Sequence, residues 1–220
     1  MAMIFDIETE PLPLEELQKV CEPFNEEDVK VGNIKDPEKI RAKIDQCREN
    51  HWKDIQERAA LNATTAKVVA IGYRDHGEET PYCDMFTSER DNIFACWNRI
   101  LQCMKKGIDI VGFHSNRFDI PFLVRRSWLI GCGIPDIFSA SGYLKPCFID
   151  LHERWQCGDR QATIKLNSLA KYFGIDGKYQ GLDGSMFFQL LKVDPATAKE
   201  YLLQDIRMTA HVAERMLGQS

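Results

Sequence analysis

Two carboxylates near the start of the chain are spaced so that they could act together. Asp6 and Glu8 alternate with Phe5 and Ile7, a pattern typical of a strand, and residues two apart on a strand project from the same face. Neighbouring carboxylates beside buried residues repel each other unless a cation lies between them. Mg²⁺ and Mn²⁺ suit such a pair because they prefer oxygen ligands. An exposed edge strand carrying two solvated acids is the alternative interpretation.

Three residues far along the chain could complete an acidic site. Asp119 follows a predicted strand at 108–113, at a strand-to-helix junction of the kind where open α/β sheets place ligand sites. Tyr201 and Asp205 are four residues apart, one turn along the same face of a predicted helix. The alternatives are a helix N-cap for Asp119 and the polar edge of an amphipathic helix for the other two residues.

The elements that must position these residues follow an α/β pattern. A short connection between two of the predicted strands indicates an antiparallel hairpin, and the order of strands and helices predicts a mixed sheet flanked by helices. Strands are predicted at 3–9, 67–73, 81–86, 108–113 and 146–151, and helices at 88–107, after Asp119, at 164–173, at 185–191 and after Asp194.

A long charged segment follows the first strand. Asp36 and Pro37 have the form of an N-cap followed by proline at the first helical position. Apolar residues then recur at spacings of three and four and predict one buried stripe. Its members are Ile40, Ile44, Cys47, His51, Ile55 and Ala59. We therefore expect residues 14–65 to form a helical insertion packed against the main sheet, within a single domain that spans 1–220.

Composition excludes several classes of protein. With 220 residues, 44% hydrophobic and 28% charged, the chain has the make-up of a folded soluble protein and not of a disordered one. The net charge of −5 means that nucleic acid would have to be bound through local basic groups or metal ions. The eight cysteines form no C-x-x-C pair, which indicates reduced thiols. No signal peptide or membrane-spanning run is present, so we expect a cytoplasmic protein and no membrane partner.

Together, the three groups of residues resemble the DEDD, or DnaQ-like, 3′-to-5′ exonucleases. Phe5-Asp6-Ile7-Glu8-Thr9 resembles the first motif of that family, Asn116-Arg-Phe-Asp119-Ile-Pro the second, and Tyr201-x-x-x-Asp205 the third in its tyrosine form. The nearest resemblance is to the proofreading domain of B-family DNA polymerases and to stand-alone relatives of that domain. It runs over nearly the whole chain, with three individually weak motifs in the right order.

The resemblance implies an RNase H-like fold with a mixed five-stranded sheet, and hydrolysis of phosphodiester bonds from a 3′ end with two divalent cations, Mg²⁺ or Mn²⁺. Asp6 would bridge both ions. Glu8 and Asp205 would hold the ion on the side of the attacking water, and Asp119 the ion on the side of the leaving group. Tyr201 would orient the water.

The substrate implied by the resemblance is a nucleic acid, with DNA favoured over RNA and a single-stranded DNA 3′ end favoured as the form that binds. Thr9 and Asn116 are the candidate substrate-binding residues, whereas a strand end and a turn former are their structural interpretations. His114 and His152 are interpreted as structural histidines.

Two other functions fit parts of the pattern. One is a catalytically silent nucleic-acid-binding module on the same fold. The other is a haloacid dehalogenase-type phosphatase, which also has an acid two residues after its nucleophilic aspartate. That family has a further acidic pair in the C-terminal half which this chain lacks, and it leaves Tyr201 and Asp205 unexplained.

Overall fold

The chain forms two compact units in the computed structural model, which describes residues 2–85, 88–175 and 187–218. The first unit consists of Met1–Thr9 and Val68–Ser220, and the second of Glu10–Lys67. The helical insertion expected at 14–65 falls inside the second unit. That the whole chain is one domain stays a prediction.

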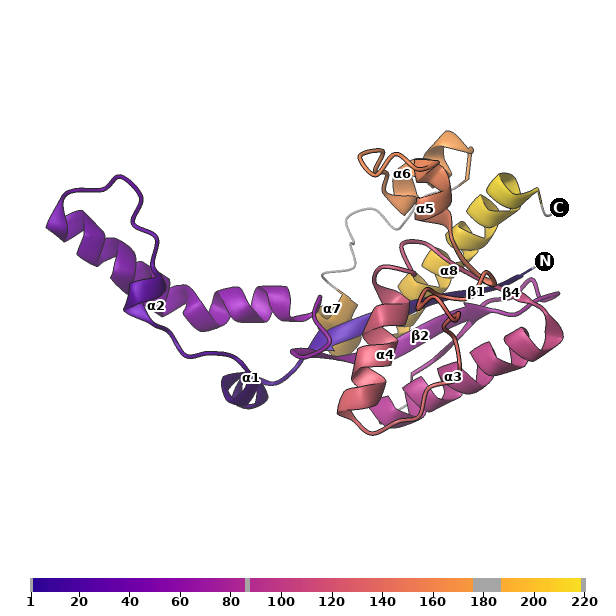
Figure 1. Cartoon of the computed structure of the whole chain (residues 1–220), viewed down its shortest axis with the longest axis horizontal. Coiled ribbons are helices and arrows are strands. Elements are labelled where there is room, and N and C mark those ends of the chain that lie inside the picture. Colours follow the sequence, from indigo (N-terminus) through magenta and orange to yellow (C-terminus); the bar gives the residue numbers. More distant parts are fainter. Residues whose placement is uncertain (1, 86–87, 176–186, 219–220) are drawn as a thin grey trace. The chain divides into compact units, whose positions relative to one another are not determined.

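A five-stranded sheet with the order β3-β2-β1-β4-β5 organises the first unit (Figure 1). Its strands are β1 (Ala2–Pro11), β2 (Ala66–Arg74), β3 (Tyr82–Asp84), β4 (Asp109–Gly112) and β5 (Phe148–Asp150). β1 runs parallel to β4, and β4 runs parallel to β5, whereas β2 and β3 are antiparallel. The sheet is therefore mixed, as the sequence predicts, and the predicted hairpin is confirmed.

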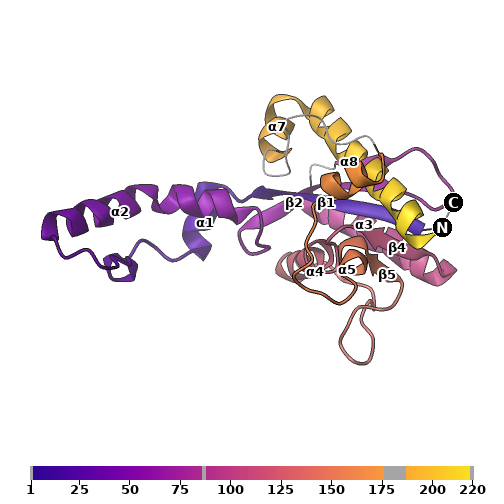
Figure 2. The same cartoon turned by 90° about the horizontal axis from the view of Figure 1, so that it is seen from above.

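Helices cover both faces of this sheet, as Figure 2 shows. On one side lie α3 and α4, and on the other lie α7 and α8. The helices of the unit are α3 (Glu89–Lys106), α4 (Asp119–Leu129), α5 (Leu151–Gln156), α6 (Leu166–Tyr172), α7 (Phe187–Val193) and α8 (Pro195–Leu217). Helix α3 has the predicted ends. The Ser88 hydroxyl accepts a hydrogen bond from the Asp91 amide, and Gly107 ends the helix in the left-handed conformation with φ +66°.

Alternate residues of β1 face the two helical layers. Ala2 and Ile4 are buried in an apolar cluster that contains Ile206 and Ala210 of α8. Met3 faces the other way, where the Cys103 thiol of α3 donates to its sulfur at 3.6 Å. Since side chains alternate along a strand, the even-numbered positions of β1 face α8. This alternation decides where Asp6 and Glu8 point.

Helix α8 approaches the sheet closely at Gly72 of β2. A β-carbon at Gly72 would lie 2.8 Å from Ile206 Cγ1 and 2.9 Å from Leu202 Cγ, closer than packed carbon atoms tolerate. Leu202, Ile206, Ala210 and Ala213 recur at helical spacing along α8 and are buried. The absent side chain at residue 72 thus lets α8 lie directly on the strands.

A largely buried ion pair joins α4 to the start of α3. Arg126 donates through Nε and Nη2 to the two carboxylate oxygens of Glu89, at 2.8 and 2.7 Å. Glu89 also accepts a hydrogen bond from the Val68 amide at 2.9 Å. The Glu89 carboxylate of α3 therefore links this helix to α4 and to strand β2.

The second unit contains α1 (Leu14–Val20), the 3₁₀ turn η1 (Glu26–Asp28) and α2 (Pro37–Ala59). Asp36 caps α2 as predicted, and its Oδ1 accepts from the Glu38 amide at 3.0 Å. The prediction of a buried stripe along α2 is wrong: Ala59 is buried, but the other five members are only partly covered. The reason is an open groove of about 540 Å³ along the helix, which Phe24, Cys47 and His51 help to line.

Some boundaries differ from the sequence-based prediction. β1 continues beyond Thr9 to Pro11, and the six-residue helix α5 directly follows β5; the sequence did not suggest a helix there. The predicted helix at 185–191 appears as α7, although Ser185 lies outside the described residues. All eight cysteines are free thiols. Among the described residues no helix combines the length and the apolar character needed to cross a membrane.

Candidate active site

The first two acidic residues project from β1 toward the α8 side of the sheet. Phe5 and Ile7 are buried, and because side chains alternate, Asp6 and Glu8 share the opposite face. Glu8 is 8% exposed, and Asp6 is partly buried. The strand therefore holds both carboxylates in place through its own buried neighbours.

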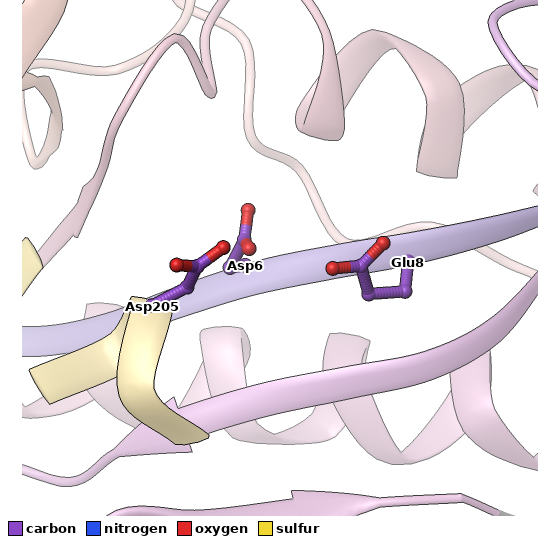
Figure 3. A group of neighbouring side chains, drawn as sticks. All are labelled: Asp6, Glu8 and Asp205. Carbon is purple, nitrogen blue, oxygen red and sulfur yellow. The ribbon is translucent and has the colours of Figure 1, made fainter. Parts of the chain in front are cut away.

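A third carboxylate reaches the same place from α8. Asp205 lies on this helix and is 6% exposed. One ligand oxygen from each of Asp6, Glu8 and Asp205 can be chosen so that all three lie within 4.8 Å of one another. Figure 3 shows the two side chains of β1 and the one of α8 that form this acidic cluster. Residues some two hundred positions apart in the sequence thus form a single group.

The chemistry of the acidic cluster suits a hard divalent cation. Three carboxylates this close, taken largely out of water, raise each other's energy through repulsion and desolvation. An ion bound between them would relieve both costs, and an all-oxygen donor set is the kind that Mg²⁺ and Mn²⁺ prefer. Asp6, Glu8 and Asp205 therefore fit the metal that the sequence implies.

Asp119 is joined to the acidic cluster through the backbone of β1. It is 3% exposed, and its Oδ1 accepts a hydrogen bond from the Ile7 amide at 3.0 Å. Ile7 is the residue between Asp6 and Glu8, so the start of α4 is attached to the strand at the acidic pair. Burial raises the pKa of Asp119 to about 7, although hydrogen bonds with the Ile7 amide and with Asp6 act in the opposite direction.

Tyr201 lies one turn before Asp205 on α8, as the spacing predicts, but in apolar surroundings. It is 2% exposed and belongs to a cluster with Ala70 and Leu202. Its ring packs against that of Phe187, with 6.1 Å between the ring centroids. The ring is thus held firmly by its neighbours.

The two predicted substrate-binding residues differ in their surroundings. Thr9 is partly buried on β1, next to Glu8. The Asn116 side chain donates from Nδ2 to Glu153 Oε2 at 3.2 Å, while its Oδ1 is buried with no hydrogen-bond partner among the described residues. His114 and His152, which we interpreted as structural, are in edge-to-face contact at 4.9 Å. Burial and the neighbouring His114 lower the pKa of His152.

One carboxylate near the site was missed by the sequence reasoning. Asp150 ends β5, is 2% exposed and is the N-cap of α5. Its oxygens also accept from the amides of His114 and Asn116. An acid followed by a short helical pattern is a recognisable capping signal, but the bonds to the loop after β4 depend on strand pairing that no local pattern shows.

Comparison with known proteins places the chain in a superfamily. Residues 54–217 match the RNase H superfamily, and since this region is most of the chain, the protein belongs to that superfamily. The mixed sheet flanked by helices agrees with this membership. The matched region begins after Asp6 and Glu8 and includes Asp119, Tyr201 and Asp205.

A solved structure extends the likeness to the N-terminal strand. The family B DNA polymerase from the hyperthermophilic archaeon Pyrobaculum calidifontis aligns with 98% of this chain, with a TM-score of 0.60 and 18% sequence identity. The alignment covers 24% of the polymerase, so the chain spans about a quarter of that protein's length. At this identity the likeness is one of fold. No curated protein sequence matches the chain.

Proposed function

We propose that this protein is a metal-dependent 3′-to-5′ exonuclease, with the 3′ end of single-stranded DNA as its favoured substrate. The observation that carries the proposal is the acidic cluster, in which β1 and α8 bring three carboxylate oxygens within 4.8 Å. Membership of the RNase H superfamily supports a nuclease. The family B DNA polymerase among the fold's neighbours supports DNA as the substrate.

The residues would divide the work between two divalent cations, Mg²⁺ or Mn²⁺. Asp6 would contact both ions, Glu8 and Asp205 would hold one, and Asp119 would hold the other. When bound, such ions supply a water of lowered pKa and neutralise charge on the phosphate and the departing oxygen. The chain's part is to hold four carboxylates on elements fixed by the core.

Tyr201 would make the protein a member of the tyrosine subtype of the DEDD exonucleases. Its ring is held by Phe187 and the apolar cluster around it, so its hydroxyl has a fixed direction. A rigid hydroxyl can orient an attacking water without itself abstracting a proton. Asn116 and Thr9 would contact the terminal nucleotide.

Degradation of a 5′-labelled single-stranded DNA oligonucleotide tests this function directly. The reaction is run with Mg²⁺ or Mn²⁺, with EDTA, and with the Asp6→Ala and Asp205→Ala proteins. We expect a ladder that shortens from the 3′ end, and no ladder with EDTA or in either variant. A parallel RNA oligonucleotide separates the two substrate classes.

Two outcomes would contradict the proposal. Binding of the oligonucleotide without any shortening, on DNA and RNA and with both metals, would identify a silent nucleic-acid-binding module. Release of phosphate from a phosphomonoester by the Asp119→Ala protein would instead favour the phosphatase. The labelled 5′ end makes 3′ shortening distinguishable from attack at the other end.

A further inference from the structure

Asp150 is a buried carboxylate that no predicted role accounts for. It accepts four backbone hydrogen bonds: its Oδ1 from the amides of His114, His152 and Glu153, at 2.9, 2.9 and 3.4 Å, and its Oδ2 from the amide of Asn116 at 3.0 Å. Capping α5 needs only the bonds from residues 152 and 153. The other two bonds hold a turn that belongs to a different part of the chain.

That turn, residues 113–118, connects β4 to Asp119. His114 has a left-handed backbone with φ 65°, a conformation that is costly for a residue with a side chain. The turn also packs tightly on β4, because a β-carbon at Gly112 would lie 2.5 Å from Ser115 Cβ. A strained, close-packed turn keeps one shape only when other groups fix it, and Asp150 supplies two such bonds.

The turn leads directly into the first residues of α4. The His114 carbonyl accepts from the Phe118 amide at 3.1 Å, and the Ser115 carbonyl accepts from the Ile120 amide at 3.0 Å. Asp119 lies between these two donors, and its own carboxylate accepts from the Ile7 amide. A continuous series of hydrogen bonds therefore runs from Asp150 through the turn and Asp119 to β1.

We propose that Asp150 is a positioning residue of the site, which fixes the Asp119 carboxylate against β1 through the turn 113–118. The kinetic part of this inference rests on the proposed exonuclease function. Residues that orient a metal ligand are typically worth about 10- to 100-fold in affinity or activity.

Asp150→Asn is the sharpest test. Asparagine is as good an N-cap as aspartate, and its single carbonyl oxygen can keep the bonds to 114, 152 and 153. Its amide group, however, would face the Asn116 amide, donor against donor. We expect kcat to fall about 10- to 100-fold and KM to rise as well, because the same turn carries Asn116, a proposed substrate contact. Asp36→Asn, the same change at the N-cap of α2, is the matched control and should leave both constants unchanged.

Two further readouts need no nucleic acid. The amide of Ile7 does not touch Asp150, but it donates to Asp119, so its NMR resonance and hydrogen-exchange rate should change in Asp150→Asn. Calorimetric titration of Mn²⁺ into the free protein should give a Kd about tenfold weaker. A protein that degrades no nucleic acid yet shows both changes would refute the exonuclease and retain the positioning role.

The inference is overturned if a folded Asp150→Asn protein keeps the native kcat, the native Mn²⁺ affinity and an unchanged Ile7 amide. It is also overturned if Asp36→Asn lowers kcat equally. Should Asp150→Asn fail to fold, Gly112→Ala displaces the same turn from the other side through Ser115. An unchanged Ile7 amide and Mn²⁺ affinity in that variant would then reject the coupling between the turn and Asp119.

Discussion

Carboxylates in this protein are held in two different ways. Asp150 accepts four amide hydrogen bonds, which stabilise a buried negative charge. Asp6, Glu8 and Asp205 instead face one another within 4.8 Å. A cluster of carboxylates that repel one another lowers the stability of the fold, and such a cost is typical of a site that serves binding or catalysis.

We expect Asp205→Asn to separate stability from activity. Removing one charge reduces the repulsion, so the variant in EDTA should melt at or above the temperature of the native protein. Exonuclease activity should fall by more than about 100-fold, because a metal ligand matters more than the outer residues that orient it.

Thermal unfolding in EDTA measures the stability of the metal-free protein, and unfolding with Mn²⁺ measures how much the bound metal adds. Binding at a hundred times Kd stabilises by about 2.7 kcal/mol, and this gain should be much smaller in the variant. A large loss of stability in EDTA would mean that the Asp205 carboxylate is mainly structural.

His152 gives the protein a pH-dependent term in its stability. Burial lowers its pKa in the folded state, so the unfolded chain binds the proton more tightly and this contribution is lost as pH falls below the ordinary histidine value near ~6.5. His152→Phe keeps an aromatic ring against Phe113 and removes the titration. In urea unfolding, the free energy of unfolding of the native protein should therefore fall relative to that of His152→Phe as the pH is lowered from 7.5 to 5.5. A difference between the two proteins that does not change with pH would contradict this prediction.

At the level of elements, local patterns predicted most of the fold. The alternation around Asp6, the cap at Asp36 and the helices at 88–107 and after Asp194 are each set by neighbours in sequence, so they were found correctly. The six-residue α5 was missed because so short a segment has almost no periodic signal. The buried stripe of α2 was wrong because periodicity shows which face is apolar but not how completely it is covered.

The candidate site shows the same division. The spacing of Asp6 and Glu8, and of Tyr201 and Asp205, can be read from the sequence because strand and helix geometry are local. The contact between β1 and α8 follows from tertiary packing. From the sequence, it could be expected only through the resemblance to a known family, which placed Asp6, Glu8 and Asp205 in one site. The bonds of Asp150 to the turn after β4 depend on β4–β5 pairing and could not be predicted.

The Glu89–Arg126 pair should be strongly coupled. Removing one partner leaves a buried charge unpaired, so Glu89→Gln and Arg126→Met should each destabilise by about 3–5 kcal/mol. The double variant Glu89→Gln/Arg126→Met should recover a large part of that loss. Denaturant unfolding of the four proteins forms the double-mutant cycle, and simple additivity of the single losses would show that the pair is not coupled.

At the level of the whole molecule, the predicted catalytic residues belong to one of the two units. All five predicted catalytic residues lie in Met1–Thr9 or Val68–Ser220. In the other unit the Leu12 amide donates to the Thr65 carbonyl at 2.8 Å, so the segment between them begins and ends at adjacent points. A short turn can therefore replace it.

Replacing residues 13–64 with a four-residue Gly/Ser turn should leave a folded protein. Its affinity for Mn²⁺ should lie within about threefold of the native value, a difference below ~1 kcal/mol, because no carboxylate of the acidic cluster is altered. Circular dichroism and calorimetry check folding and binding in turn. A folded but metal-free protein would show that the site depends on the second unit.

The order of the elements along the chain also sets when the acidic cluster can assemble. β1 lies between β2 and β4, and its acidic residues are completed only by α8, so on the ribosome the N-terminal carboxylates emerge long before Asp205 has been synthesised. Folding rates fall as contacting residues lie further apart in sequence. A growing chain therefore lacks the complete acidic cluster until α8 has been made, which would delay the proposed nuclease activity until the rest of the fold is in place.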